Sequence, residues 1–464
     1  MFRLATAGLS LALVLAGCAA HQDMPAPAVA GAAGHWIDAG PAGPLAANWW
    51  QGLGDAQLDA LVARALAANP DLAEAEARLR SARASVEAAR GRSLPQVNAT
   101  GSATTNAQSG NGMIPFGRLP GVTRTYDLFD AGFDASWELD LWGGRASAVR
   151  AAAARADVAA AKRAGSALSV AAEVVRLYTE LRGDQARRTN LAAQEEALTA
   201  LLALQQARFS AGEAPRDESL GTSQRLDALR ASLASAEADT AAAAYGLAVL
   251  TGQPPEAMGE LLAKPAPIPA TPEVALIGLR SEVLARRPDV RAAAAELLAY
   301  RADADVAHAA LFPSLSLTGS IGQQARTTGD FTAANSLRYG FGPSLHWPVF
   351  AGGQLRGQLR GARAESAAAA ARYEKAVLTA LSDSETAANR LARAAQAQAA
   401  TQNAAAAAEQ VAVLAGQRFD HGEDTRLQAL EARLSALMAE GAALAARTSH
   451  VQAYAALGKA LGAS

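Results

Sequence analysis

The residues of this chain that could do chemistry are few, and their spacing builds neither a catalytic nor a metal site. The histidines show none of the short spacings that metal ligands use. No Gly-x-Ser-x-Gly nucleophile motif is present, and the glycine-rich stretch 110–121 lacks the lysine of a phosphate-binding loop. We therefore expect no enzyme activity, no metal and no cofactor. The six histidines are His21, His35, His308, His346, His421 and His450.

The single cysteine, Cys18, ends an N-terminal export signal. Arg3 is followed by an apolar run from Leu4 to Val14, which is too short to span a bilayer, and then by Leu15-Ala16-Gly17. This order resembles the bacterial lipoprotein box, which implies that Cys18 becomes the acylated first residue of the mature chain. An ordinary signal with a chance cysteine is the alternative. Because Ala19 rather than aspartate follows, the resemblance implies an outer-membrane destination, and one cysteine leaves no disulfide.

The composition favours long, closely packed helices. Hydrophobic residues make up 50% of the 464 residues but aromatic residues only 5%, because alanine is abundant, and alanine is the best helix former. The net charge of −2 provides no basic field for nucleic acid. No segment after the signal has 18 apolar residues without a charge, so we expect no membrane-spanning helix in the mature chain.

The sequence repeats itself. Residues 70–102 align without a gap on residues 288–320, and 12 of these 33 positions are identical. A second block repeats at an offset of 209 to 210 and includes Gly143-Gly144 with Gly352-Gly353. Internal repeats indicate one duplicated architecture rather than two unrelated domains.

Strict alternation predicts strands in each repeat. Every odd residue from Phe129 to Leu139 is apolar and the even residues are polar or glycine, and 337–349 shows a similar pattern. Partner strands are predicted at 95–107 and 313–324, which gives two hairpins. Apolar and polar faces of this length suit strands that cross a membrane, although hairpins on a soluble core would alternate in the same way. Aromatic residues near the strand ends would form interfacial girdles: Tyr126, Trp137, Trp142, Tyr339 and Trp347.

Two very long helices are predicted at 145–209 and 354–419. The first contains no proline and only two glycines, Gly165 and Gly183. Each ends at Arg-Phe-x-x-Gly, where the cation complements the helix dipole and glycine allows a left-handed cap, and a return helix follows. The expected organisation is a signal peptide at 1–17, an acylated tether at 18–47, a first repeat at 48–251 with strand hairpin 95–139 and helical hairpin 143–251, a Pro-rich linker at 252–272, and a second repeat at 273–464 with strand hairpin 313–350 and helical hairpin 352–462.

Four strands cannot close a barrel, because the smallest membrane barrels have about eight strands and an open edge is not tolerated in lipid. Several copies must therefore associate. A trimer would supply twelve strands, and the two repeats of each copy would give it approximate six-fold symmetry.

The ordered motifs resemble the TolC/OprM outer-membrane efflux family, and the tether resembles its lipoprotein branch. The resemblance implies a mainly α fold with a small β part, in a homotrimer that forms a 12-strand outer-membrane β-barrel continuous with a periplasmic α-helical barrel. It also implies a passive duct that exports small molecules such as drugs together with a periplasmic adaptor (membrane fusion) protein and an inner-membrane pump. The motifs are Asn48-Trp49-Trp50, Asn69-Pro70-Asp71, Trp142-Gly143-Gly144-Arg145, Arg287-Pro288-Asp289-Val290 and Phe350-Ala351-Gly352-Gly353.

The resemblance places the adaptor contact at the two helical-hairpin tips. The same arginine and glycine residues could serve only to cap and turn the helices, and the sequence identifies no gate residue. A duct for type I protein secretion and a lipid-anchored periplasmic coiled-coil scaffold remain alternative functions. The candidate tip residues are Arg208, Phe209, Gly212, Glu213, Arg418, Phe419, Gly422 and Glu423.

Overall fold

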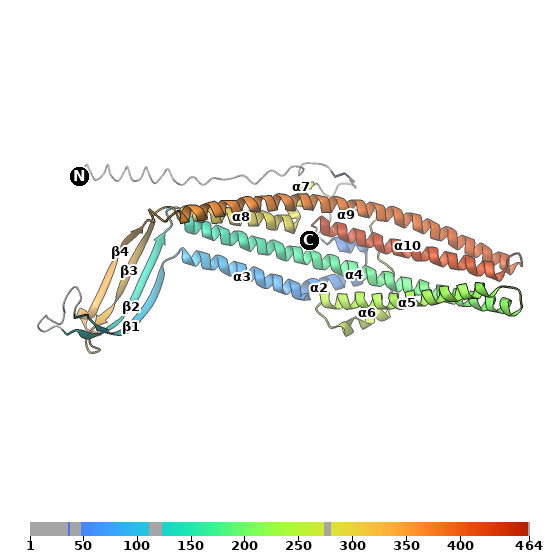
Figure 1. Ribbon diagram of the computed structural model, residues 1–464, viewed down its shortest axis with the longest axis horizontal. Coiled ribbons are helices and arrows are strands. Elements are labelled where there is room, and N and C mark those ends of the chain that lie inside the picture. Colours follow the sequence, from blue (N-terminus) through green and yellow to red (C-terminus); the bar gives the residue numbers. More distant parts are fainter. Residues whose placement is uncertain (1–35, 38–47, 111–122, 273–279, 463–464) are drawn as a thin grey trace. The chain divides into compact units, whose positions relative to one another are not determined.

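A computed structural model describes residues 36–37, 48–110, 123–272 and 280–462 (Figure 1). The predicted signal peptide, Cys18 and nearly all of the predicted tether lie outside the described residues. None of the described helices is long and apolar enough to cross a membrane.

The described residues form two compact units, and each unit draws on both repeats. The first comprises Arg80–Val158 and Ala294–Arg372 and contains all the described strands. The second comprises the described residues of 36–79, 159–293 and 373–462 and contains both helical-hairpin turns.

The strands of the first unit form a single antiparallel sheet in the order β1-β2-β3-β4 (Figure 1). The sequence predicts two hairpins, and the structure joins them, because β2 pairs with β3 from Phe129 opposite Ala325 to Leu139 opposite Leu315. Strands β1 and β4 are therefore the two edges of the sheet. The strands are β1 (Gln96–Ala107), β2 (Thr125–Leu139), β3 (Ser314–Ala325) and β4 (Leu337–His346).

The register places all odd-numbered strand residues on one face of the sheet and all even-numbered residues on the other. Phe133 lies opposite Ile321, which lies opposite Tyr339, and each pair joins odd with odd. Asp134 lies opposite Ser320 in the same way. Since directly opposed residues share a face, the alternation of the sequence separates a mostly apolar face from a mostly polar face.

Long helices follow each strand pair along the chain. Helices α4 (Gly144–Ser210) and α9 (Gln354–Asp420) have 67 residues each, and their return helices α5 (Arg216–Leu250) and α10 (Arg426–Ala460) have 35 each. At 1.5 Å per residue the longer helices measure about 100 Å. The equal lengths in the two halves follow from the internal repeat.

Short helices precede the strands of each repeat, and side-chain caps begin two of them. The Asp55 carboxylate accepts from the backbone N–H groups of Gln57 and Leu58 at 2.9 and 3.0 Å, at the start of α2. Asn69 caps the first turn of α3 in the same manner. The elements are η1 (Trp49–Leu53), α2 (Ala56–Ala68), α3 (Pro70–Arg92), α7 (Arg280–Arg286), α8 (Pro288–Ala309) and a short turn η4 (Ala334–Ser336).

The main core of the second unit gathers around Trp49, which is 2% exposed. Its ring lies edge-on to Tyr454, with ring centroids 5.8 Å apart. Gly458 allows this contact, because a Cβ at that position would lie 2.5 Å from the indole of Trp49. The Asn-Trp-Trp motif is thus a packing element of the helical unit.

The predicted linker 252–272 is a packed part of this core rather than a free connection. It contains η3 (Pro255–Met258) and α6 (Gly259–Ala263), and Met258, Leu261 and Ile268 are buried. Proline removes backbone donors and disfavours long helices, but it does not prevent a segment from burying its apolar side chains.

Candidate functional sites on the sheet and at the helical tips

An ion pair crosses the polar face of the sheet. The Arg338 guanidinium in β4 donates to both carboxylate oxygens of Asp130 in β2, at 2.6 and 2.8 Å. Gln324 in β3 donates to the same carboxylate at 2.7 Å. In the register Arg338 lies opposite Gly322 of β3, which has no side chain to block the path between β4 and β2.

Two glycines crease the sheet between β2 and β3. Gly132 and Gly322 are directly opposed in the register. A Cβ at Gly132 would lie 2.5 Å from the Ile321 oxygen, and a Cβ at Gly322 would lie 2.5 Å from the Ala131 oxygen. Both positions are even-numbered, so the strands fold toward each other on the polar face. The crease therefore makes the polar face the inner side of the bend, and glycine kinks are a known means of curving a sheet into a barrel.

The other face exposes large apolar side chains. Phe341 is 88% exposed, Tyr339 72% and Phe133 58%. Ile321 and Leu345 are also exposed on this face. Soluble monomers rarely leave a contiguous apolar surface of this kind uncovered. An apolar outer face and a polar inner face are the pattern of strands that face lipid on one side and water on the other.

Two of the residues predicted for the aromatic girdle do not lie on the apolar face of the sheet. Trp137 and Tyr339 occupy odd positions on the apolar face. Tyr126 occupies an even position opposite Asn106, so it lies on the polar face, where the Arg326 guanidinium stacks 4.4 Å from its ring centroid. Trp142 follows the sheet, is only partly exposed and stacks on Phe312 with centroids 4.8 Å apart. Proximity to a strand end does not fix the face, which the parity of the position decides.

Tryptophan indole groups bind backbone carbonyls at one end of the sheet. Trp137 donates to the Ser93 oxygen at 3.0 Å. Trp142 donates to the Pro313 oxygen at 2.7 Å. Trp347, which directly follows β4 and is exposed, has its indole nitrogen 3.4 Å from the Leu311 oxygen. Tryptophan side chains with one polar contact and an apolar body are typical of a membrane interface.

At the first helical tip, the predicted cap is present. The Glu213 N–H donates to the Arg208 oxygen at 2.9 Å and the Gly212 N–H to the Phe209 oxygen at 3.0 Å. Gly212 has a φ of 77°, the left-handed conformation that glycine adopts without strain. The Arg208 guanidinium lies 3.6 Å from the Glu218 carboxylate in the return helix. Phe209 remains 44% exposed.

The second tip repeats this turn with a different ion pair. The Glu423 N–H donates to the Arg418 oxygen at 2.8 Å, and Gly422 has a φ of 76°. Arg418 lies 3.6 Å from Asp424 rather than from the return helix. Position 428, the counterpart of Glu218 at an offset of 210, is a glutamine that closes a capping box with Thr425. The two tips therefore have the same backbone but present different side chains.

An apolar cluster supports the two hairpins close to their tips. Leu201 of α4 and Leu226 of α5 are buried together with Leu434 and Leu437 of α10. Because side chains from both hairpins share this cluster, their turns are held next to each other within the second unit. Arg208, Phe209, Gly212 and Glu213 of the first tip are thus brought near the same end of the unit as their four counterparts.

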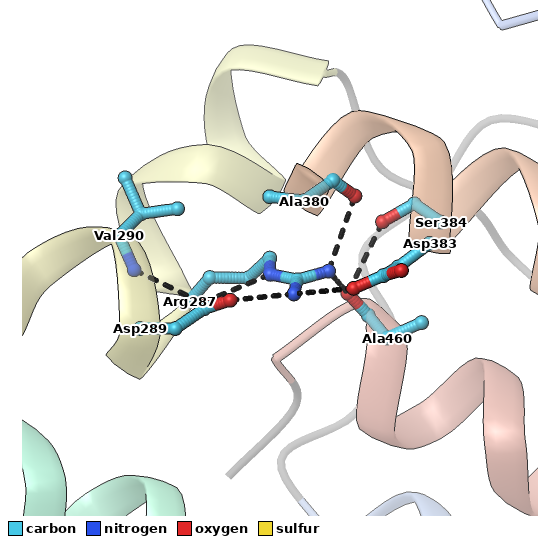
Figure 2. A network of polar contacts seen from close by, with 7 residues as sticks. All are labelled: Arg287, Asp289, Val290, Ala380, Asp383, Ser384 and Ala460. Carbon is cyan, nitrogen blue, oxygen red and sulfur yellow. Dashed lines mark hydrogen bonds and ion pairs between the residues drawn. The ribbon is translucent and has the colours of Figure 1, made fainter. Parts of the chain in front are cut away.

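A buried arginine, which the sequence analysis did not single out as functional, connects helices of the second unit (Figure 2). The Arg287 side chain is 8% exposed and pairs with Asp289 at 2.6 Å and Asp383 at 3.3 Å. It also donates to the backbone oxygens of Ala380 and Ala460, at 3.1 and 2.8 Å. One cation thus joins the start of α8 to α9 and to the last turn of α10, where helix carbonyls lack partners.

In the first repeat, an uncharged side chain binds the corresponding carbonyl at the end of the return helix. Asn69 occupies the position equivalent to Arg287 at an offset of 218 and donates to the Leu250 oxygen at 3.0 Å, at the end of α5. In the second repeat, burial raises the pKa of the Asp289 carboxyl, but its bonds to Arg287 outweigh burial and leave that pKa below the ordinary value. The motif Arg287-Pro288-Asp289-Val290 was the signal that could have identified Arg287.

No group of three potential ligands for a metal ion occurs among the described residues.

A profile of outer membrane efflux proteins matches residues 61–253 and 279–463, which is more than half of the chain. The chain belongs to the outer membrane efflux protein family. Its mainly helical fold with a small strand part is that of the family's outer-membrane channels.

Several members of the family are similar to this chain over most of their length. The pyoverdine export outer membrane protein OpmQ of Pseudomonas aeruginosa is 33% identical over 431 residues, which cover 89% of this chain and 87% of that protein. The multidrug resistance outer membrane protein MdtP of Shigella flexneri is 30% identical, with 85% and 81% covered. The structure of the outer-membrane channel OprN has a TM-score of 0.85 at 31% identity and covers 96% of this chain and 99% of that chain.

These likenesses support three of the expectations from the sequence. The chain is an outer-membrane efflux protein, and its relatives are transport proteins rather than enzymes. It is located in the outer membrane of a Gram-negative bacterium. A periplasmic scaffold held only by lipid does not fit this family.

Proposed function

We propose that three copies of this efflux protein close a twelve-stranded barrel in the outer membrane. The observation that carries the proposal is the four-stranded sheet, whose edges β1 and β4 pair with no further strand of the described chain and whose apolar face is exposed. Two copies would give about eight strands, an interior that side chains fill, whereas twelve strands leave a water-filled passage. The antiparallel order allows β4 of one copy to pair with β1 of the next.

In this assembly the polar face lines the passage. The crease at Gly132 and Gly322 bends the sheet toward that face, as closure around a polar lumen requires. The apolar face, with Phe341 and Tyr339, meets the lipid. The homotrimer would be a passive conduit, and the energy for transport would come from a partner pump.

The helical tips would bind a periplasmic adaptor protein, which links the conduit to an inner-membrane efflux pump. Phe209 and Phe419 are exposed beside the paired arginines Arg208 and Arg418, and the same turn is present twice. Gly212-Glu213 and Gly422-Glu423 complete the two turns. Repeated, rigid turns with an exposed aromatic residue and a neighbouring cation are suitable anchors for a partner.

Small molecules are the cargo we favour over secreted proteins. The relatives named above are a pyoverdine export protein and a multidrug resistance protein, and both names refer to small molecules. Acylation of Cys18 would add a lipid anchor. A Cys18→Ala chain should lose a fatty-acid label but stay in the membrane fraction, because the barrel holds it there.

Efflux is tested in a strain that lacks its own outer-membrane channels. Co-expression of the chain with an adaptor and a pump should lower the accumulation of a fluorescent drug, and omission of any one of the three should restore it. Native mass spectrometry of the purified chain should give three copies. A monomer, or accumulation that does not depend on the chain, would overturn the proposal. Export of a protein toxin instead would favour the secretion alternative.

A further inference from the structure

The polar face of β2 carries three acidic residues, and two of them are neutralised by arginine. Asp130 is held by Arg338 at 2.6 Å. Glu138 is held by Arg145 at 2.5 Å. The third is Asp134, which shares the face because it occupies an even position in the same register. The distribution of arginines thus singles out one carboxylate of the sheet.

Asp134 has no cation within ion-pair distance among the residues that the structure describes. The Thr100 hydroxyl donates to its carboxylate at 3.0 Å. Its neighbours across the sheet are Asn98 on one side and Ser320 and then Gly340 on the other, all uncharged. Arg338 attracts Asp134 electrostatically, but its ion pair is with Asp130. Among the described residues the Thr100 hydroxyl is thus the one direct donor to the Asp134 carboxylate, whose remaining acceptor capacity is open to mobile ions.

Small residues leave space above this carboxylate. An open groove of about 400 Å³ lies against Asp134, and its other polar lining residues are Asn98, Ser136, Thr318 and Ser320. Gly340 also lines the groove, and a Cβ there would meet no atom within 4 Å. Arg338, two residues before Gly340, is already bound to Asp130. A hydrated cation can therefore approach Asp134 without displacing a side chain.

We propose that Asp134 sets the charge preference of the conduit. The inference rests on the proposed trimer, in which three Asp134 carboxylates project into the passage at one level. Rings of carboxylates attract cations and repel anions, and the apolar wall behind them strengthens the field. The ligands they favour are small inorganic cations and protonated amines, and the species they disfavour are anions.

The test is the reversal potential of single channels in planar bilayers under a potassium chloride gradient. The wild-type trimer should prefer potassium. Asp134→Asn should lower the permeability ratio of potassium to chloride by about threefold or more, because three charges act in a water-filled pore. Asp134→Glu should retain the preference, which shows that the charge and not the fold is responsible.

A matched control is available on the same strand. Asp127 lies at an odd position, opposite Thr105, whose hydroxyl donates to it at 2.7 Å. Asp127→Asn removes the same charge from the other face and should leave the ratio nearly unchanged. Conducting Asp134→Asn trimers with the wild-type ratio, or an equal shift in Asp127→Asn, would overturn the role of Asp134. A wild-type protein that forms no trimer or no channel would overturn the conduit itself.

Discussion

The guanidinium of Arg338 in β4 passes over β3 to reach the Asp130 carboxylate in β2, with nitrogen to oxygen distances of 2.6 and 2.8 Å. The path is open because Gly322, directly opposite Arg338, has no side chain. Both groups are largely shielded, with side-chain exposures of 32% and 16%. The bond ties together two strands that are not neighbours, across the polar face of the sheet.

Gly322→Ala should weaken the sheet. The new Cβ would lie 2.5 Å from the Ala131 oxygen and 2.8 Å from the Gly132 Cα, so the crease must open. We expect a loss of about 1–3 kcal/mol, as for other overpacked sites. The measurement is the temperature at which heating unfolds the purified protein, detected as a change of its mobility on a gel. Gly340→Ala is the control, since its Cβ meets nothing within 4 Å. Equal transition temperatures for the two variants would contradict the crease.

Arg287→Ala should destabilise the helical unit. It leaves the buried backbone oxygen of Ala380, the partly buried oxygen of Ala460 and two carboxylates without their cation. Removal of one partner from a buried charged network costs about 3 kcal/mol. Thermal unfolding followed by the helical circular dichroism signal measures the loss. Arg150→Ala, which breaks an exposed ion pair with Asp305, should cost less than about 1 kcal/mol. Similar losses in both variants would refute the special role of Arg287.

Asp184 should make stability fall as the pH rises. Burial, and then the neighbouring Asp239 and Glu180, raise the pKa of this carboxyl from its ordinary value of 3.8 to about 6. The folded state therefore binds the proton more tightly than the unfolded state. Ionisation of Asp184 therefore lowers the free energy of unfolding. This loss is absent below about pH 4 and fully present above about pH 6.

The corresponding variant is Asp184→Asn. Because the side chain is partly exposed and screened by solvent, we expect a gain of about 1 kcal/mol at neutral pH and no gain at about pH 4. Urea unfolding at the two pH values measures it. Asp157→Asn, at an exposed aspartate of the same helix, should change stability at neither pH. A gain for Asp184→Asn that is the same at both pH values would rule out ionisation as its cause.

Charge reversal at both tips should weaken adaptor binding. Arg208→Glu combined with Arg418→Glu places like charges beside Glu218 and Asp424. The double variant thus reverses the charge of one side chain at each turn. We expect at least a severalfold drop in crosslinking to the adaptor with the oligomer intact. The control reverses two exposed arginines of α9 that lie away from the turn, Arg390 and Arg393. Unchanged crosslinking and unchanged drug resistance would argue against adaptor binding at the tips.

Most of the fold could be predicted because its signals are local. Alternation from Phe129 to Leu139 predicts β2 and its two faces, and the glycines Gly212 and Gly422 predict where the long helices end. The pairing of β2 with β3 could not be predicted in this way. Residues 140–313 separate the two strands along the chain, so no turn signal joins them and only tertiary structure brings them together.

The details of the sites depend on tertiary structure. Tyr126 lies on the polar face because its position is even, which matters only once the register is known. The Arg338 to Asp130 bond links residues 208 positions apart, and the crease requires Gly132 and Gly322 to be opposed. No local pattern in the sequence reports such contacts. The packing of segment 252–272 was missed because its prolines indicate irregular backbone, not exposure.

The most direct test of the central claim is a disulfide between the two sheet edges. Within one chain β1 and β4 are separated by two strands, about 14 Å, which is too far for a disulfide. In the proposed trimer β4 of one copy lies beside β1 of the next. Gly340→Cys is combined in turn with a cysteine at each even position of β1 from Asn98 to Asn106, so that both thiols share the polar face.

Oxidised membranes carrying the matching pair should give covalent dimers and trimers on a non-reducing gel. Each variant with only one of the two added cysteines, which retains the native Cys18, should run as a monomer. If every pair ran only as a monomer while the protein remained folded in the membrane, the edges would not meet, and closure of a barrel by three copies would be contradicted.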